Sequence, residues 1–315
     1  MRKVIGIGET VLDIIFKDDQ PVQAVPGGSS FNAIISLGRA GVPAMFIGEA
    51  GNDHVGDNVK KYLTDNHVDA SHVNTFPNSK SPISLAFLDE HNNANYIFYK
   101  DHPHDQLEFV NPEINEDDVV LFGSYFAINP VVRPQVKGFL EYAKQHGAIL
   151  YYDVNYRSSH RHEVMKMTPN ILENLELADI VRGSDEDFDN MYHKQDADAI
   201  YRSEISFYTK KFIYTRGSQP TLVRADNGFS REYPVQSQQP AVSTIGAGDN
   251  FNAGFVYGLI RHGITRSHIE GSLTPAQWDA VVHDAQCFAA NCCQSINNSI
   301  DPAFGEQMKQ QLNNL

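Results

Sequence analysis

From Val119 onward, short apolar runs alternate with stretches of helical spacing. The apolar runs include Val119–Gly123, Ala148–Asp153 and Phe212–Thr215, and the stretch 131–146 between the first two has the pattern of a helix. Nearly continuous apolar strands separated by helices are typical of a parallel sheet covered by helices. The sequence therefore predicts an α/β fold, a three-layer sandwich with a mostly parallel central sheet.

Three further runs do not fit this alternation and predict a small accessory sheet. Residues 16–25 are strand-like but polar, and a hairpin with a polar turn follows in 83–89 and 95–100. The hairpin strands alternate large apolar residues with smaller or polar ones, so one face would be dry and the other wet. We expect these segments, at about 14–26 and 80–103, to form a lid over a site in a single domain.

The composition excludes several classes of protein. The 315 residues carry a net charge of −14 and contain no basic run, which argues against binding of nucleic acid. The first apolar run is too short for a signal peptide, and no run approaches the ~20 apolar residues of a membrane span. Cys287, Cys292 and Cys293 lack the paired spacing of a zinc site. We expect a cytoplasmic protein with reduced thiols and no membrane partner.

The stretch Gly246-Ala247-Gly248-Asp249 precedes a run with helical spacing, 251–260. The first N–H groups of a helix have no partner inside it, and the helix dipole is positive there, so a phosphate can bind. Glycines let the backbone approach such a ligand closely. Asp249 would then be a general base that takes a proton from an attacking hydroxyl. The alternative is a tight turn in which Asp249 only complements the dipole.

Two more candidate ligand-binding residues lie in the first third of the chain. Asp13 follows the predicted first strand, Val4–Ile7, and ligands of parallel α/β sheets bind beyond the carboxyl ends of the strands. Asn32 lies one turn into a helix that starts near Gly28 and that we expect a serine to cap. Asp13 could instead be a plain turn residue, and Asn32 could merely bond to the helix backbone.

Four motifs, in this order and spread over nearly the whole chain, make the sequence resemble the ribokinase-like, or PfkB, carbohydrate kinases. They are Gly27-Gly28-Ser29-Ser30-Phe31-Asn32 (GGxxxN), Gly51-Asn52-Asp53-His54-Val55-Gly56 (GxDxxG), Asp153-Val154-Asn155-Tyr156-Arg157 (like DPNxR) and Gly246-Ala247-Gly248-Asp249 (GAGD). The DPNxR-like segment is similar to that of the fructokinase-like branch. The resemblance implies one ribokinase-like kinase domain over residues 1–315, with an α/β core and a β lid.

The resemblance also implies an ATP-dependent phosphotransferase that uses Mg²⁺. Asp249 would be the base, and the amides of Gly246, Ala247 and Gly248 would form the anion hole. The remaining implied roles are sugar binding by Asp13, Gly28 and Asn32, contact with the nucleotide by Thr215 and Gly217, a phosphate clamp at Arg157 and metal binding at Asp187. Gly217 as a turn glycine and Arg157 as a surface cation are the alternatives for these two.

The sequence departs from the family pattern in two places. The NxxE motif of the magnesium and phosphate network is replaced by Ser184-Asp185-Glu186-Asp187, which keeps an acid but loses the amide. This weakens the metal assignment more than the activity, because Mg²⁺ can be held through water. Ser243 stands where the family usually has an aspartate that helps to hold potassium, so we expect little stimulation by potassium.

The resemblance indicates phosphorylation of a primary hydroxyl on a free sugar, with fructose as the best match. Relatives that act on phosphorylated hexoses tend to carry a lysine where this chain has Ser29 and Ser30. Keto-deoxygluconate kinases tend to have Tyr-x-Arg in the lid, where this chain has Phe98-Tyr99-Lys100. Ribose, a nucleoside and 2-keto-3-deoxygluconate remain alternatives, as does a sugar-binding regulator with weakened catalysis. A homodimer joined through the lid sheets is also predicted.

Overall fold

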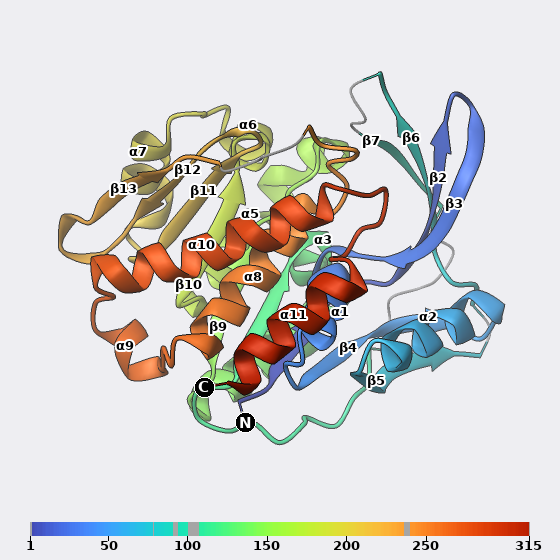
Figure 1. Cartoon of the computed structure of the whole chain (residues 1–315), viewed down its shortest axis with the longest axis horizontal. Helices are drawn as coiled ribbons and strands as arrows, with labels where there is room; N and C mark the ends of the chain where they lie inside the picture. Colours follow the sequence, from blue (N-terminus) through green and yellow to red (C-terminus); the bar gives the residue numbers. More distant parts are fainter. Residues whose placement is uncertain (1, 78, 91–93, 100–106, 236–239, 315) are drawn as a thin grey trace. The chain divides into compact units, whose positions relative to one another are not determined.

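The computed structural model describes residues 2–77, 79–90, 94–99, 107–235 and 240–314 (Figure 1). The chain divides into two units: unit 1 comprises 1–110, 237–262 and 280–315, and unit 2 comprises 111–236 and 263–279.

Among its described residues, unit 1 contains three parallel strands in the order β1 (Val4–Ile7), β4 (Ala44–Gly51) and β5 (Val68–Phe76). Every residue of β1 is buried, as the predicted apolar first strand requires. The helices of unit 1 are α1 (Ser29–Arg39), α2 (His54–Asp65), α8 (Ala247–Arg261), most of α10 (Pro275–Cys292) and α11 (Pro302–Asn313). Helix α1 packs against both α8 and α11, and the three lie side by side in Figure 1.

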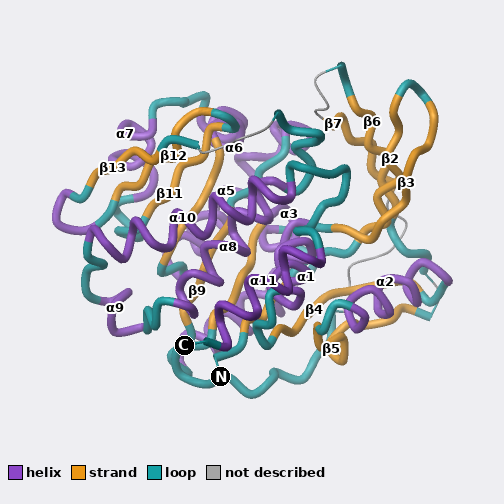
Figure 2. The backbone as a smooth tube through the Cα atoms, in the orientation of Figure 1, coloured by secondary structure: helices purple, strands orange, loops and turns teal. Residues whose placement is uncertain are grey.

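The predicted accessory sheet is present in unit 1. Its strand order is β3 (Gln20–Gly27), β2 (Val11–Lys17), β6 (Ile83–Leu88) and β7 (Ala94–Tyr99), and the four run side by side (Figure 2).

The prediction of one strand over 16–25 is wrong. β2 and β3 form an antiparallel hairpin that turns at Asp18 and Asp19, whose φ angles of 51° and 60° aspartate tolerates. Asp13 consequently lies within a strand of the small sheet, and not in a loop after β1. Residues 91–93 and 100–103 of the predicted lid fall outside the described residues.

The described part of unit 2 contains six strands in the order β13-β12-β11-β10-β9-β8. Four are parallel, as predicted: β8 (Val119–Gly123), β9 (Ile149–Asp153), β10 (Ile180–Ser184) and β11 (Phe212–Arg216). The edge strands β12 (Gln219–Arg224) and β13 (Ser230–Tyr233) are antiparallel and form a hairpin at this edge of the sheet.

The helices of unit 2 follow the strands in the expected alternation. They are α3 (Ser124–Ile128), α4 (Arg133–Gln145), α5 (Val164–Leu177), α6 (Asp185–Tyr192), α7 (Ala197–Ile200) and α9 (Arg266–Glu270). The single helical turn α3 begins at Ser124, which has a φ of 54°, directly after β8. Such a short element has too few residues to show helical spacing in the sequence.

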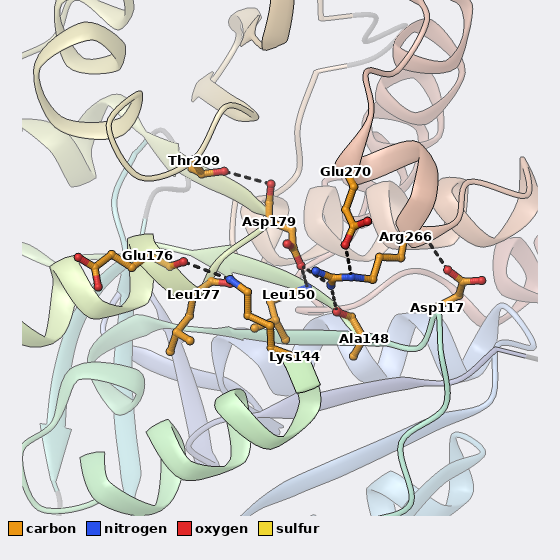
Figure 3. Close-up of polar contacts among 10 residues, drawn as sticks. All are labelled: Asp117, Lys144, Ala148, Leu150, Glu176, Leu177, Asp179, Thr209, Arg266 and Glu270. Carbon is orange, nitrogen blue, oxygen red and sulfur yellow. Dashed lines mark hydrogen bonds and ion pairs between the residues drawn. The ribbon is translucent and has the colours of Figure 1, made fainter. Parts of the chain in front are cut away.

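Arg266 fixes helix α9 to the amino-terminal ends of β9 and β10 (Figure 3). Its Nη1 donates to the Ala148 carbonyl at 2.6 Å and lies 3.4 Å from Asp179 Oδ2. Asp179 Oδ2 in turn accepts a hydrogen bond from the Leu150 amide at 2.8 Å. Asp117 Oδ1 accepts from the backbone amide of Arg266 at 2.5 Å. A returning segment distant in sequence is thus held at the strand edge opposite to the one where ligands of parallel sheets bind.

Over the residues that the structure describes, no helix combines the length and apolar character needed to cross a membrane.

Candidate active site

Helix α8 begins at Gly246, which has a φ of 73° and no side-chain cap. A Cβ at this position would lie 2.5 Å from the Asn298 carbonyl oxygen, so both the conformation and the space require glycine. The N-cap thus offers no side-chain acceptor to the first amides of the helix, and this is the helix end at which anions bind. The Ala247 amide donates to the Thr244 carbonyl at 3.2 Å, so it would have to exchange that bond to bind a phosphate. The anion-hole roles of Gly246 and Gly248 stay predictions.

Asp249 lies in the first turn of α8 and is only 8 % exposed. Asn32 Nδ2, on α1, donates to Asp249 Oδ2 at 2.8 Å. One turn further along α1, Ser36 Oγ donates to Oδ1 of Asn250, the residue after Asp249, at 2.5 Å. These two bonds fix α1 against α8 and orient the carboxylate. The side chain of Asn32 therefore serves Asp249, and the alternative that it only bonds to its own helix backbone is wrong.

Asp13 is the second carboxylate of unit 1 near this helix start. It is buried in β2, and its Oδ1 accepts from Ser84 Oγ on the neighbouring strand β6 at 2.5 Å. Burial raises the pKa of Asp13 to about 6, and the charges of Asp249 and Glu9 raise it as well. Hydrogen bonds from the side chains of Ser84 and Asn298 act in the opposite direction. Asp13 thus belongs to the same electrostatic cluster as Asp249.

Two glycines make room for these groups. A Cβ on Gly27 would lie 2.2 Å from Asp13 Oδ2, and a Cβ on Gly28 would lie 2.3 Å from the Glu9 carbonyl oxygen. Gly28 also has a φ of 136°, which a side chain disfavours. It occupies the N-cap of α1 without a side-chain cap, so the expectation that a serine caps this helix is wrong. Sugar binding by Gly28 stays a prediction.

The nucleotide-side candidates lie in unit 2, where a buried arginine joins three strands. Arg182 on β10 donates through Nη1 to Asp153 Oδ1 on β9 at 2.9 Å, and through Nη2 to Thr215 Oγ1 on β11 at 2.6 Å. Arg182 and Asp153 are 7 % and 2 % exposed. The side chain of Thr215 is therefore fixed at the carboxyl end of its strand, the edge at which ligands bind.

Asp187 is also buried, and both of its oxygens accept backbone hydrogen bonds. Oδ2 accepts from the Ser184 amide at 2.6 Å, which closes a capping box at the start of α6, and Oδ1 accepts from the Tyr156 amide at 2.8 Å. Burial and the Asp153 charge raise the pKa of Asp187 to about 6, against the opposing charges of Arg182 and the exposed Arg157. Ser184, which replaces the asparagine of NxxE, therefore caps helix α6.

A magnesium ion fits this carboxylate only as an outer ligand. Within the described ranges, no group of three or more His, Cys, Asp or Glu residues could hold a metal ion. Mg²⁺ in phosphoryl-transfer enzymes keeps several waters and binds mainly through one or two carboxylates and the phosphates of its substrate. Asp187 therefore suits contact with the ion through water, and a direct metal bond would compete with its two backbone donors.

Gly217 and Ser243 complete the predicted set. Gly217 turns the chain between β11 and β12 at a φ of 53°, and a Cβ there would meet nothing within 4 Å. The backbone conformation explains the glycine, and the open space agrees with a ligand passing over it. Ser243 is fully buried, and its Oγ accepts from the Ile245 amide at 3.1 Å, which braces the loop before Gly246.

The sequence profile described as pfkB family carbohydrate kinase matches residues 1–295. The chain belongs to this family. PfkB kinases phosphorylate carbohydrates, and the chain is accordingly a carbohydrate kinase. A 5-dehydro-2-deoxygluconokinase from Geobacillus thermodenitrificans (strain NG80-2) is 31% identical over 250 residues, which cover 74% of this chain and 72% of the relative.

Solved structures of a fructokinase and of an aminoimidazole riboside kinase have the same fold. A fructokinase from Vibrio cholerae O395, bound to fructose, ADP and calcium, has a TM-score of 0.84 at 22% identity and covers 98% of this chain and 99% of its own. An aminoimidazole riboside kinase from Salmonella enterica has a TM-score of 0.78 at 20% identity, covering 99% and 100%. The chain shares their three-layer α/β fold with a large, mostly parallel sheet and a small separate sheet.

Three residues of these clusters did not emerge from the sequence. Ser84 is one hydroxyl in a strand that alternates in any case, and nothing in the sequence links it to Asp13. Asn298 lies in a polar segment after α10 that reads as an ordinary loop. Arg182 carried a usable signal, because a cation inside the apolar run at 180–182 must find a buried partner.

The pKa of Asp13 predicts an acid limb in the pH profile of sugar binding, that is, a range at low pH in which binding weakens. As pH falls through about 6, Asp13 becomes protonated, and in its predicted sugar-binding role it would accept hydrogen bonds from sugar hydroxyls less well. We expect sugar binding without ATP to weaken by about tenfold per pH unit below that value, as for a single essential carboxylate. In Ser84→Ala the limb should move to higher pH, because the Ser84 hydroxyl lowers the pKa of Asp13. Calorimetric titrations from pH 5 to 8 measure both, and an unmoved limb in the variant would contradict the assignment.

Proposed function

We propose that this PfkB kinase transfers the γ-phosphoryl group of ATP to a primary hydroxyl of a free, uncharged sugar, with fructose as the first candidate. The observation that carries the proposal is the buried Asp249, oriented by Asn32 at an uncapped helix start. A base held beside an anion site has the parts that phosphoryl transfer needs.

In this proposal each cluster has a separate task. Asp249 takes the proton of the attacking hydroxyl, while the start of α8 stabilises charge on the transferred group. Asp13 and Asn32 hold other hydroxyls of the sugar. Thr215, Gly217 and Arg157 serve the nucleotide. Asp187 would hold Mg²⁺ through water, and the ion would offset negative charge on the phosphates. We propose that the two units act together as one kinase domain.

The charges around Asp13 favour an uncharged acceptor. The carboxylates of Asp249 and Glu9 already raise the pKa of Asp13, so a further anion next to them would be repelled. The absence of a lysine at Ser29 and Ser30 argues in the same direction for phosphorylated sugars. A second candidate is 5-dehydro-2-deoxygluconate, a sugar acid, because relatives that are named as its kinases are 31% identical to this chain.

A panel of acceptors tests the proposal through ATP consumption by the purified protein. Fructose, fructose 6-phosphate, ribose, a nucleoside, 2-keto-3-deoxygluconate and 5-dehydro-2-deoxygluconate should be compared by kcat/KM. We expect fructose to exceed fructose 6-phosphate by at least about 100-fold, because a second phosphate would lose its hydration without a paired cation. Preference for 5-dehydro-2-deoxygluconate would establish the second candidate. Sugar binding without any turnover would establish a sugar-binding regulator.

We also propose a homodimer joined through the lid sheet, in a cytoplasmic protein. The lid strands carry exposed apolar side chains at Val22, Ile97 and Tyr99, which are 48%, 48% and 54% exposed. Exposed apolar side chains on a small sheet are a common feature of interfaces. Sedimentation velocity at micromolar concentration decides this, and a monomer alone would refute it.

A further inference from the structure

Asn298 lies in the segment between α10 and α11 and is 1 % exposed. Its Nδ2 donates to the Pro26 carbonyl at the end of β3, at 3.0 Å, and a hydrogen bond from its side chain also acts on Asp13. Gly27 leaves the space for this contact, because a Cβ there would lie 2.2 Å from Asp13 Oδ2 and 2.9 Å from Asn298 Nδ2. A carbonyl and a carboxylate only accept, so they fix which end of the amide faces them.

The opposite end of this amide is a buried acceptor. Asn298 Oδ1 has no hydrogen-bond partner among the residues that the structure describes, and the same is true of Asn32 Oδ1. The Asn32 amide is oriented in the same way, since its Nδ2 donates to Asp249. Native proteins rarely leave buried polar atoms unpaired, and such atoms commonly mark the place of a ligand or water. Two amide oxygens thus accompany the carboxylates of Asp13 and Asp249.

We propose that Asn298 is a specificity-determining residue of the acceptor site, which holds Asp13 through Nδ2 and accepts a hydroxyl of the sugar through Oδ1. The inference rests on the proposed function of the same site. It deepens that function, because two carboxylates and two amide oxygens together offer only hydrogen-bond acceptors. Their complement is an acceptor substrate that presents several hydroxyl donors and no negative charge near them.

The backbone of Asn298 reaches the phosphoryl side of the site as well. Its carbonyl oxygen accepts from Asn250 Nδ2 at 3.0 Å, and this oxygen is the atom that a Cβ on Gly246 would meet. Asn298 therefore contacts Asp13 through its side chain, and Asn250 near the start of α8 through its backbone carbonyl. Replacing only its side chain leaves the backbone contact in place, so the effect should fall on the sugar and not on ATP.

The test combines Asn298→Ala with a set of monodeoxy analogues of the best acceptor, measured by calorimetry without ATP and by steady-state kinetics. We expect Asn298→Ala to raise the KM for sugar about tenfold or more, with the KM for ATP changed less than about twofold. One deoxy analogue should bind the wild-type protein about tenfold more weakly than the parent sugar, yet bind Asn298→Ala as well as the parent does. Such non-additivity identifies a direct contact, which a merely structural role would not produce.

Asn298→Asp is a second, nearly isosteric variant that keeps the test open if the alanine protein folds poorly. It replaces the donor to Asp13 by a carboxylate, so the pKa of Asp13 should rise and the acid limb of sugar binding should move to higher pH. The matched control is Asn297→Ala. The Asn297 side chain accepts a hydrogen bond from Gln23 on β3 at 2.7 Å, and its removal should leave sugar binding unchanged.

The outcomes separate this inference from the proposed function. Equal losses for every deoxy analogue in wild type and Asn298→Ala, together with an unmoved acid limb in Asn298→Asp, would overturn the role of Asn298. A wild-type protein that binds sugars but phosphorylates none would overturn the proposed function alone, because the binding titrations still decide the contact.

Discussion

The Asp249→Asn variant should turn over at about one thousandth of the wild-type rate, while its affinity for sugar stays within about threefold. An amide cannot take the proton of the attacking hydroxyl, so the loss falls on the chemical step. The asparagine side chain has the same shape. Its oxygen can still accept from Asn32 Nδ2, which in the wild-type protein lies 2.8 Å from Asp249 Oδ2. The measurement is kcat with the best acceptor, beside calorimetric titration of that acceptor.

Asp284→Asn is the matched control for removing a buried carboxylate that contacts helix α8. Asp284, on α10, is 3 % exposed and pairs with Arg261 Nη1 at 2.9 Å near the carboxyl end of α8. Asp249 and Arg261 are twelve residues apart, about 18 Å along a helix. The control should lose stability but keep kcat. Equal kcat in wild type and Asp249→Asn would exclude Asp249 as the base, and the absence of turnover in both would favour a regulator.

The features that the sequence predicted are those encoded in neighbouring residues. The parallel strands of unit 2 were visible because each is an apolar run bounded by a helical pattern, and β8 and β9 match their predicted ranges closely. The start of α8 was predictable because the two glycines and Asp249 follow one another in the chain. A helix start positions such residues by local geometry alone, without any tertiary contact.

The features that escaped prediction depend on contacts between distant residues. Asp13 was expected just beyond the carboxyl end of the first strand, but the pairing of β2 with β6 places it within a strand of the small sheet, opposite Ser84, 71 residues away. Asn298 reaches Pro26 across 272 residues. Strand pairing in the small sheet and the return of the chain after α10 are set by packing, which a local pattern does not record.

The second large effect concerns stability and is expected for Arg182→Met. Arg182 is 7 % exposed and faces the buried carboxylates of Asp153 and Asp187. Removing one partner of a buried ion pair leaves the other charge uncompensated and typically costs 3–5 kcal/mol, roughly. We expect a melting temperature lower by on the order of 10 °C. Thr215 Oγ1 also loses its donor, so the KM for ATP should rise.

Arg224→Met is the control, because Arg224 on β12 is equally buried but its partner is not. Arg224 Nε lies 2.5 Å from Asp198 Oδ1, and the Asp198 side chain is 49% exposed, so water can solvate the carboxylate once the arginine is gone. The cost should stay near or below about 1 kcal/mol. A loss in Arg182→Met no larger than in this control would show that the buried pair is not what holds the three strands together.

The pH dependence of the Arg182→Met loss identifies its cause. The pKa of Asp187 is already raised to about 6, so the folded protein binds this proton more tightly than the unfolded chain, and ionisation of Asp187 removes stability as pH rises through that value. Arg182 opposes this shift, so its removal raises the pKa of Asp187 further and enlarges the loss at high pH. Denaturant unfolding should therefore show a larger difference between Arg182→Met and wild type at pH 8 than at pH 5. A difference that is independent of pH would instead assign the effect to lost packing of the arginine side chain, because the volume that methionine fails to fill does not change with protonation.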